Sequence, residues 1–243
     1  MRKILTIAAT AATAVVAATA AHADININNA GLNAGNFKYF AEDMSSAFSY
    51  KPNIPTEPLS GLIPIGFDVG VSLSSTKLES AGKQYLAAGL EGDTTVLLPT
   101  LRAHVGIPFG IDVGVAHASY GNVKYTGAEL RYAIMKGGIA LPAVGIRGSM
   151  SKISGVDNFD FSSKGVDLSI SKGILMLTPY AGVGRVWSDV KATVPIYGKL
   201  SSDVSQSKVF AGVGFKVLLL NLNIEADKTG DATTYAAKVG LRF

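Results

Sequence analysis

The chain has 243 residues, no cysteine, 48% hydrophobic residues, only 16% charged residues and a mean hydropathy of +0.30. This composition excludes a disordered chain and an ordinary charged cytosolic domain. Glycine is frequent, with 27 residues, while aromatic residues make up 8%, a balance that favours closely approaching strands over a helical bundle. Two classes remain open: a membrane protein and an unusually apolar secreted β-protein.

Residues 1–23 are predicted to be a cleaved secretory signal peptide. Arg2 and Lys3 form a positive start, residues 4–21 are uncharged and mostly apolar, and Ala21-His22-Ala23 has the small-x-small pattern of a cleavage site. A permanent membrane anchor is the alternative, but Ala and Thr make the run only weakly hydrophobic. We therefore expect export with cleavage after Ala23. Without cysteine, neither a lipid-modified Cys nor a disulfide can form.

The mature chain is nearly neutral and has no candidate membrane helix. Removing the signal peptide leaves 20 Lys and Arg against 18 Asp and Glu in 220 residues. No basic block interleaved with aromatic residues is present, so binding to nucleic acid is not expected. The longest uncharged apolar run, 217–222, is six residues long, far below the roughly 18 that a transmembrane helix needs.

A short amphipathic helix is predicted over 36–48. Asn36 can cap it, and large apolar residues recur on one stripe. These residues are Phe37, Phe40, Met44 and Phe48. Four prolines then fall within residues 52–64, and they exclude both a helix and a central strand there. Residues 24–65 are therefore expected to be a helix with an extended, Pro-rich lead-in.

From residue 66 onward the sequence alternates apolar residues with polar residues or glycine, which is the pattern of strands with two different faces. About ten strands are predicted, within a range of eight to twelve. Their ranges are 66–77, 94–105, 110–119, 123–135, 139–151, 160–171, 174–188, 207–218, 220–228 and 232–243. Most are near ten residues, the length of a tilted strand that crosses a bilayer, and bacterial barrels have even strand numbers.

The connections between the strands favour the same architecture. Tight turns are predicted near 107–109, 136–138, 171–173 and 219–221, and longer loops near 78–93, 152–159 and 189–206. Short periplasmic turns and longer external loops are typical of transmembrane barrels. Two connections on the external side, near 120–122 and 228–231, are predicted to be short as well, so the difference in loop size is only a trend.

The predicted fold class is all-β, a transmembrane antiparallel up-and-down β-barrel over 66–243. Lipid outside and glycines such as Gly182 and Gly212 inside explain both faces of the strands. A secreted β-sandwich or a soluble lipocalin-like barrel is the alternative. The helix at 36–48 has two possible places: a plug inside the barrel, or an amphipathic cap on the periplasmic side. The plug is favoured because the stiff lead-in continues directly into the first strand.

The last nine residues resemble the C-terminal targeting signal of bacterial outer-membrane β-barrels. The residues that carry the pattern are Tyr235, Val239, Gly240, Leu241 and Phe243. The resemblance implies an outer-membrane location, contact with outer-membrane lipid, and the barrel-assembly machinery and periplasmic chaperones as partners during biogenesis. Addition of the unpaired strand to a partner sheet is the physical basis of such recognition.

The start of the mature chain is similar to an uncharacterised family of proteobacterial outer-membrane proteins. The similarity is carried by Ala-Phe-Ser-Tyr-Lys-Pro at 47–52, Glu-Pro-Leu at 57–59 and Gly-Phe-Asp at 66–68. It implies a barrel with an N-terminal helical lead-in, and it supplies no catalytic residue.

Charged residues of both signs fall on the predicted inner face of the barrel. These are Asp68, Arg102, His104, Asp112, Glu129, Arg131, Arg147, Asp167, Lys208, Lys216, Glu225, Lys238 and Arg242. We expect them to pair and to rigidify a narrow lumen, since buried charges require partners. The alternative is a polar path for a small solute, with Arg and Lys favouring anions.

Catalysis has little support in the sequence. The mature chain has two histidines, His104 on the polar face and His117 on the apolar face, and no nucleophile and base are spaced to meet. Their opposite faces disfavour a shared metal. The pairs Gly182-x-Gly184 and Gly212-x-Gly214 lie within strands, without the helix that phosphate binding requires. No enzymatic activity, metal or cofactor is therefore expected.

The expected function is that of an outer-membrane β-barrel acting as a narrow or plugged channel or transporter for small solutes of unknown identity, or as a structural envelope protein. One alternative is a surface protein that binds a partner through its external loops, in the manner of an adhesin. An outer-membrane hydrolase is a further, weaker alternative.

Overall fold

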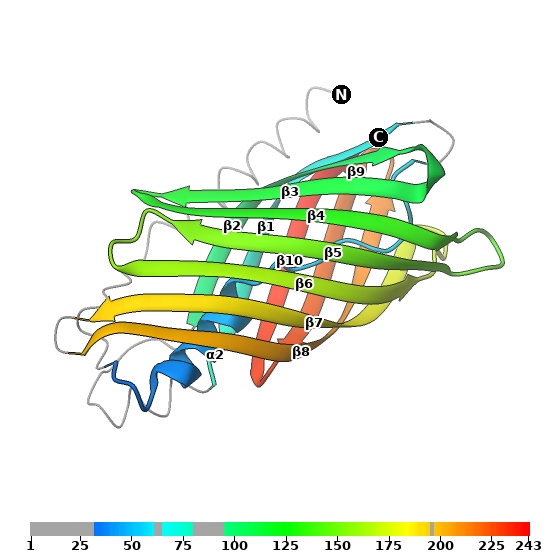
Figure 1. Cartoon of the computed structure of the whole chain (residues 1–243). Helices are drawn as coiled ribbons and strands as arrows, with labels where there is room; N and C mark the ends of the chain where they lie inside the picture. Colours follow the sequence, from blue (N-terminus) through cyan, green and yellow to red (C-terminus); the bar gives the residue numbers. More distant parts are fainter. Residues whose placement is uncertain (1–31, 61–64, 80–94, 195–196) are drawn as a thin grey trace.

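The computed structural model describes residues 32–60, 65–79, 95–194 and 197–243, and the predicted signal peptide and its cleavage after Ala23 lie outside these ranges. One helix precedes ten strands that close into a barrel (Figure 1). The elements are α2 (Phe37–Phe48), β1 (Gly66–Lys77), β2 (Thr95–Ile107), the 3-10 turn η3 (Pro108–Gly110), β3 (Ile111–Tyr120), β4 (Val123–Lys136), β5 (Ala143–Ser154), β6 (Phe159–Ser171), β7 (Leu177–Val194), β8 (Gly198–Val217), β9 (Leu220–Thr229) and β10 (Ala232–Arg242). No helix among the described residues is long and apolar enough to cross a membrane.

Every strand pairs antiparallel with its neighbour in sequence, and β1 pairs with β10 to close the barrel. Closure runs along the full length of β1, from Asp68 opposite Arg242 to Lys77 opposite Thr233. Phe67 and Phe243 exchange two backbone hydrogen bonds, at 2.6 and 2.9 Å. A closed barrel leaves no unpaired edge. The predicted fold class, an all-β barrel of ten antiparallel strands with an N-terminal helix, is confirmed.

The barrel has two rims. At the near rim β1 begins, β10 ends, and the strands are joined by 108–110, 137–142, 172–176 and 218–219. At the far rim the connections are 78–94, 121–122, 155–158, 195–197 and 230–231. The short connections expected near 120–122 and 228–231 are present, whereas the longer loop expected near 152–159 has only four residues, 155–158. The expected long loop at 189–206 is instead the paired continuation of β7 and β8.

The outer face carries an exposed apolar band that begins at the near rim. On β6 it consists of Val166, Leu168 and Ile170, each between 45% and 49% exposed. Tyr132 and Phe215 lie toward the near rim, while Trp187 lies at the opposite edge of the band. Such a band bordered by aromatic residues is the surface that a bilayer covers.

Toward the far rim the two faces of the strands exchange polarity. On β7 the outward residues become Asp189 and Lys191, while Val190, Ala192 and Val194 are buried inside. This exchange is the reason that 189–206 resembles a loop in sequence. Strands therefore continue beyond the apolar band and enclose an apolar interior there.

Helix α2 lies inside the barrel, in its far-rim part (Figure 1). Nine of its twelve residues are buried, and it contacts β7, β8 and β10 most extensively. The helix is thus a plug. The alternative of a cap on the periplasmic side, next to the start of the first strand, is wrong. The lead-in passes through the lumen before it reaches β1, so that helix and strand start lie at opposite ends.

The apolar band makes a prediction about substitution with arginine. Leu168→Arg should lower the free energy of unfolding by about 2–4 kcal/mol in lipid vesicles, because the charge enters the hydrocarbon region. The control is Ser162→Arg, on the same strand and face but beyond the band, where we expect a change under about 1 kcal/mol. Equal effects of the two changes in denaturant unfolding would contradict this position of the band.

Candidate functional site: the plugged lumen

Aromatic packing holds the helix in the far-rim part of the lumen. Phe40 meets the ring of Phe159 edge-on, with centroids 6.0 Å apart, and Phe48 meets Phe161 at 5.9 Å. Ala41 on the helix is fully buried. Each aromatic pair contributes about 0.5–1.5 kcal/mol beyond its burial. The predicted plug residues Phe37, Phe40, Met44 and Phe48 are all buried in this cluster.

Hydroxyl groups add polar contacts between the helix and the wall. The hydroxyls of Ser45 and Ser188 are hydrogen-bonded at 2.7 Å. Ser46 donates to the carbonyl of Thr229 at 2.8 Å, and Ser151 on β5 donates to the carbonyl of Phe48 at 2.7 Å. These contacts join the helix to β7, β9 and β5, so more than one side of the barrel holds it.

The extended lead-in, residues 49–60, then fills the rest of the lumen, and glycines in the wall make room for it. A Cβ atom added to Gly127 would lie 2.6 Å from the Tyr50 ring, and one added to Gly214 would lie 2.8 Å from Pro55. At Gly106 the added atom would lie 2.5 Å from the Cβ of Leu59. These distances are below van der Waals contact, so the inward glycines are required by the close approach of the plug.

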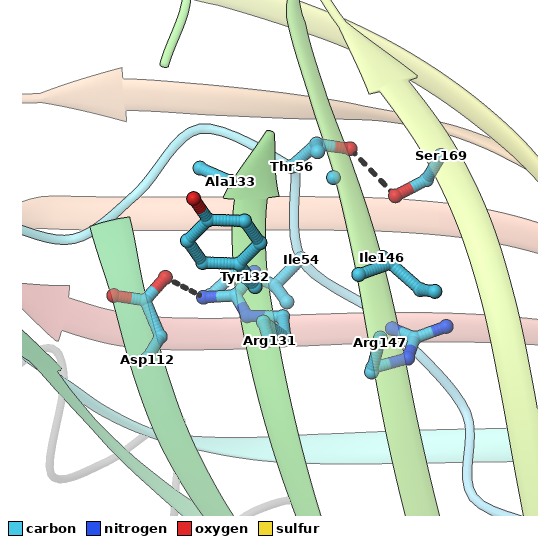
Figure 2. A pocket seen from close by; sticks show the side chains of 10 residues that line it. Ile54, Thr56, Asp112, Arg131, Tyr132, Ala133, Ile146, Arg147 and Ser169 are labelled. Atoms are coloured by element: carbon cyan, nitrogen blue, oxygen red, sulfur yellow. Dashed lines mark hydrogen bonds and ion pairs between the residues drawn. The ribbon is translucent and has the colours of Figure 1, made fainter. Parts of the chain in front are cut away.

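Cationic side chains of the wall donate to the backbone carbonyls of the lead-in. Figure 2 shows Thr56 of the lead-in hydrogen-bonded to Ser169 of the wall, with Arg131 on a neighbouring part of the wall. The donors and acceptors are Lys208 to Tyr50 (2.8 Å), Arg102 to Lys51 (2.6 Å), Arg131 to Pro55 (2.9 Å) and Arg242 to Pro58 (3.2 Å). An extended chain has no internal carbonyl partners, and these cations supply them.

The backbone N–H groups of the lead-in are satisfied by wall carboxylates and a hydroxyl. Asn53 donates to Glu225 at 2.7 Å, Glu57 to Ser171 at 3.1 Å and Leu59 to Asp112 at 3.1 Å. The prolines at 52, 55 and 58 have no N–H group to satisfy. Asn53 has a positive φ of 49°, a conformation that asparagine adopts more readily than most residues.

Ion pairs link the wall charges into a nearly continuous ring around the lumen. Arg131 binds Asp112 at 2.8 Å, and Glu129 lies 3.4 Å from Arg131 and 3.6 Å from Arg147. Arg147 binds Asp167 through two nitrogens, one at 2.9 Å. The series continues through Lys208, which lies 3.6 Å from Asp227. The plug joins the ring through Lys51, whose ammonium group is 2.9 Å from Asp227 and 2.7 Å from the Ser46 carbonyl.

A second branch of the ring crosses β1, β2 and β10. His104 Nε2 lies 3.1 Å from Glu129 Oε1, and its Nδ1 lies 4.0 Å from Asp68. Asp68 pairs with Lys238 on β10. His104 is therefore a buried link between two carboxylates.

Most charges predicted to face the lumen are brought together there. Those that are buried on the inner face are Asp68, Arg102, His104, Asp112, Glu129, Arg131, Arg147, Asp167, Lys208, Glu225 and Lys238. Lys216 is exposed at the near rim and Arg242 is half-buried there. Lys51 and Asp227, also buried, were missed.

The residues of the predicted assembly signal form the strand that closes the barrel. Tyr235 is exposed on the outer face, and Phe243 packs against Phe67 with ring centroids 5.7 Å apart. Gly240 lies against the β1 backbone, because an added Cβ would lie 2.7 Å from the Val69 carbonyl oxygen. Recognition of this strand by an assembly partner stays a prediction.

Comparison with known proteins gives no family. No family model matches the sequence, and no curated protein matches it. Among solved structures, the chain is similar to the N-terminal barrel domain of Pseudomonas aeruginosa OprF, with a TM-score of 0.39, 10% identity, and coverage of 72% of this chain and 97% of that one. It is also similar to the attachment invasion locus protein Ail of Yersinia pestis, with a TM-score of 0.37, 14% identity and coverage of 74% and 97%. At these values the similarity carries no information on function.

The architecture itself identifies the class. A closed antiparallel barrel with an exposed apolar band and a polar, charged interior is stable only when lipid covers the band. The chain is a transmembrane β-barrel of the outer-membrane type. Its interior is occupied by its own N-terminal segment.

The pair between Lys51 and Asp227 predicts an unequal response to two lysine substitutions. Lys51→Met should lower the free energy of unfolding by roughly 3–5 kcal/mol, because it leaves a buried carboxylate short of a partner. Lys38→Met is the control, since Lys38 is exposed and lies 3.8 Å from Glu42 on the helix surface. We expect that change to be below about 0.5 kcal/mol. Denaturant unfolding in detergent compares the two, and similar values would contradict the structural role of Lys51.

Proposed function

We propose that the protein is a closed outer-membrane barrel that acts in the envelope as a structural protein and does not conduct solutes in its resting state. The observation that carries the proposal is the lead-in at 49–60, which runs through the lumen with its carbonyls bound by Lys208, Arg102 and Arg131. In a channel those cations would be free to bind a solute, whereas here they donate hydrogen bonds to the backbone of the lead-in.

The small space left in the lumen supports the same proposal. A narrow cavity lined by both polar and apolar side chains lies beside Thr56 and Arg131 (Figure 2). Thr56 is hydrogen-bonded to Ser169 at 2.9 Å and Arg131 to Asp112 at 2.8 Å, so even this region is internally bonded. The charges of the ring neutralise one another rather than line an open path.

The polarity exchange supports one orientation of the barrel in the membrane. The strands extend beyond the apolar band only at the far rim, and the 78–94 connection is also there. External extensions and long external loops are the usual arrangement, with the chain ends of the barrel toward the periplasm. The far rim, with helix α2, is then extracellular.

We propose a non-enzymatic role as well. His104 is 1% exposed within the ring of ion pairs. His117 faces outward at the edge of the apolar band, where an interfacial imidazole needs no catalytic explanation.

Binding of a partner at the far rim, in the manner of an adhesin, is the second candidate function. The paired, polar outer faces of β7 and β8 form a surface there.

Planar-bilayer recording tests closure. The intact mature protein should give no conductance steps above bare bilayer, and deletion of residues 24–60 should produce them. A second variant keeps the test valid if the deletion does not fold: Ser45→Cys with Ser188→Cys, whose hydroxyls lie 2.7 Å apart, should lock the plug by a disulfide in a chain that has no other cysteine. Steps of equal size from the intact and the oxidised variant proteins would contradict a plugged lumen and support a channel.

Cysteine labelling tests the orientation. Ala34 and Asn122 are exposed at the far rim, and Ala140 is exposed at the near rim. We expect an impermeant maleimide to label Ala34→Cys and Asn122→Cys on intact cells, and Ala140→Cys only after the outer membrane is opened. Labelling of Ala140→Cys alone on intact cells would reverse the orientation. Labelling of Asn122→Cys without Ala34→Cys would instead contradict the position of the helix.

A further inference from the structure

Four cations form a diagonal line across four neighbouring strands on the outer surface. They are Lys124 on β4, Lys152 on β5, Lys164 on β6 and Arg185 on β7, and all four are exposed. We call this set the basic stripe.

The register of the sheet places the members of the basic stripe side by side. Lys152 pairs with Thr126 and Ser162, two residues from Lys124 and Lys164. Lys164 in turn pairs with Trp187, two residues from Arg185. Each cation is thus the diagonal neighbour of the next on the same face, a separation of about 7–8 Å.

The basic stripe follows the far-rim edge of the apolar band. On β5, β6 and β7 the cation is the first polar outward residue after the apolar ones, which are Met150, Val166 and Val183. These three apolar residues are 45–59% exposed. Three of the four positive charges therefore lie next to the surface that hydrocarbon covers. On β4, Thr126 lies between Lys124 and the apolar residues of that strand.

The charge of the basic stripe is not neutralised within the protein. None of its four members forms an ion pair with a carboxylate of the described residues. The outward carboxylates Asp160 and Asp189 lie closer to the far rim, and Asp189 binds Lys191 at 3.0 Å. Arg185 donates its Nε to Ser205 at 2.9 Å, which fixes the guanidinium and leaves its remaining donors outward.

A ligand that satisfies this surface must combine an anionic headgroup with acyl chains. We propose that the basic stripe binds the phosphates of a phosphorylated glycolipid in the outer leaflet, with its acyl chains along the outer faces of β5, β6 and β7. Lys and Arg bind phosphate as point charges and as a planar fork, and clusters of such residues at a membrane edge recognise anionic lipids. The proposal rests on the orientation given under the proposed function, since only that orientation places the stripe in the outer leaflet.

Binding of lipid A that carries two phosphates tests the proposal. The intact purified protein is mixed with this lipid in a zwitterionic detergent, and bound lipid is counted by native mass spectrometry. Replacing all four stripe residues by Gln should weaken binding at least tenfold, because each cation near the headgroup adds severalfold to the attraction. The variant with Arg in place of the three lysines should bind as the wild type does.

The matched control removes the same charge elsewhere on the outer face: Lys77→Gln, Lys191→Gln, Lys199→Gln and Lys228→Gln, all at exposed lysines. It should bind as the wild type does. Equal loss in the two fourfold variants would overturn the proposal, since attraction would then depend on net charge alone. Undiminished binding of dephosphorylated lipid A, or complete displacement by millimolar inorganic phosphate, would overturn it too. Labelling at Ala34, Asn122 and Ala140 separately reports whether the orientation fails.

Discussion

The structure depends on supplying hydrogen-bond partners to an extended chain inside a barrel. Residues 49–60 form neither helix nor sheet, and each buried carbonyl or N–H left unpaired would cost about 1–3 kcal/mol. Lys208, Arg102 and Arg131 satisfy carbonyls, while Glu225 and Asp112 accept N–H groups. These wall charges are stable in the interior because they also pair with one another. The ring of ion pairs and the threaded segment therefore require each other, and neither is explained alone.

Because of the same requirement, the wall of the lumen has two parts that differ in polarity. Around the lead-in the wall is charged or glycine, so that backbone can approach it, as at Gly127 and Gly214. Around helix α2, whose backbone is already bonded internally, the wall is apolar, with Phe159 and Val190. A helix needs apolar neighbours and an extended strand needs polar ones. The outer surface changes in the opposite direction, from apolar to polar, because the strands extend out of the bilayer at the level where the helix begins.

The alternating pattern was sufficient to predict the ten strands and the inner charges, because the two faces of each membrane-crossing strand differ from each other in polarity. It failed for 189–206, where the interior is apolar and the exterior polar, since alternation gives no sign of which face is inside. The far-rim position of helix α2 was also missed. Twelve extended residues reach about 40 Å, so a lead-in within the lumen carries the helix to the opposite end. The length of the lead-in could be counted in the sequence. The pairing of Lys51 with Asp227, 176 positions apart, could not be predicted, because it depends on how the strands are aligned in the closed barrel.

The order of assembly follows from the same geometry. Helix α2, with a diameter of about 10–12 Å, lies on the far side of the ring of ion pairs from the near rim, and the lead-in occupies the ring. Moving the helix through a finished ring would break several buried ion pairs at once. We expect closure to take place around a segment that is already in position. The strand that closes the barrel is β10, and Phe243, which follows it, exchanges backbone hydrogen bonds with Phe67 at the start of β1. Strand β1 thus contacts the lead-in inside the lumen, through Ser72 and Asn53, and pairs with β10 along its edge.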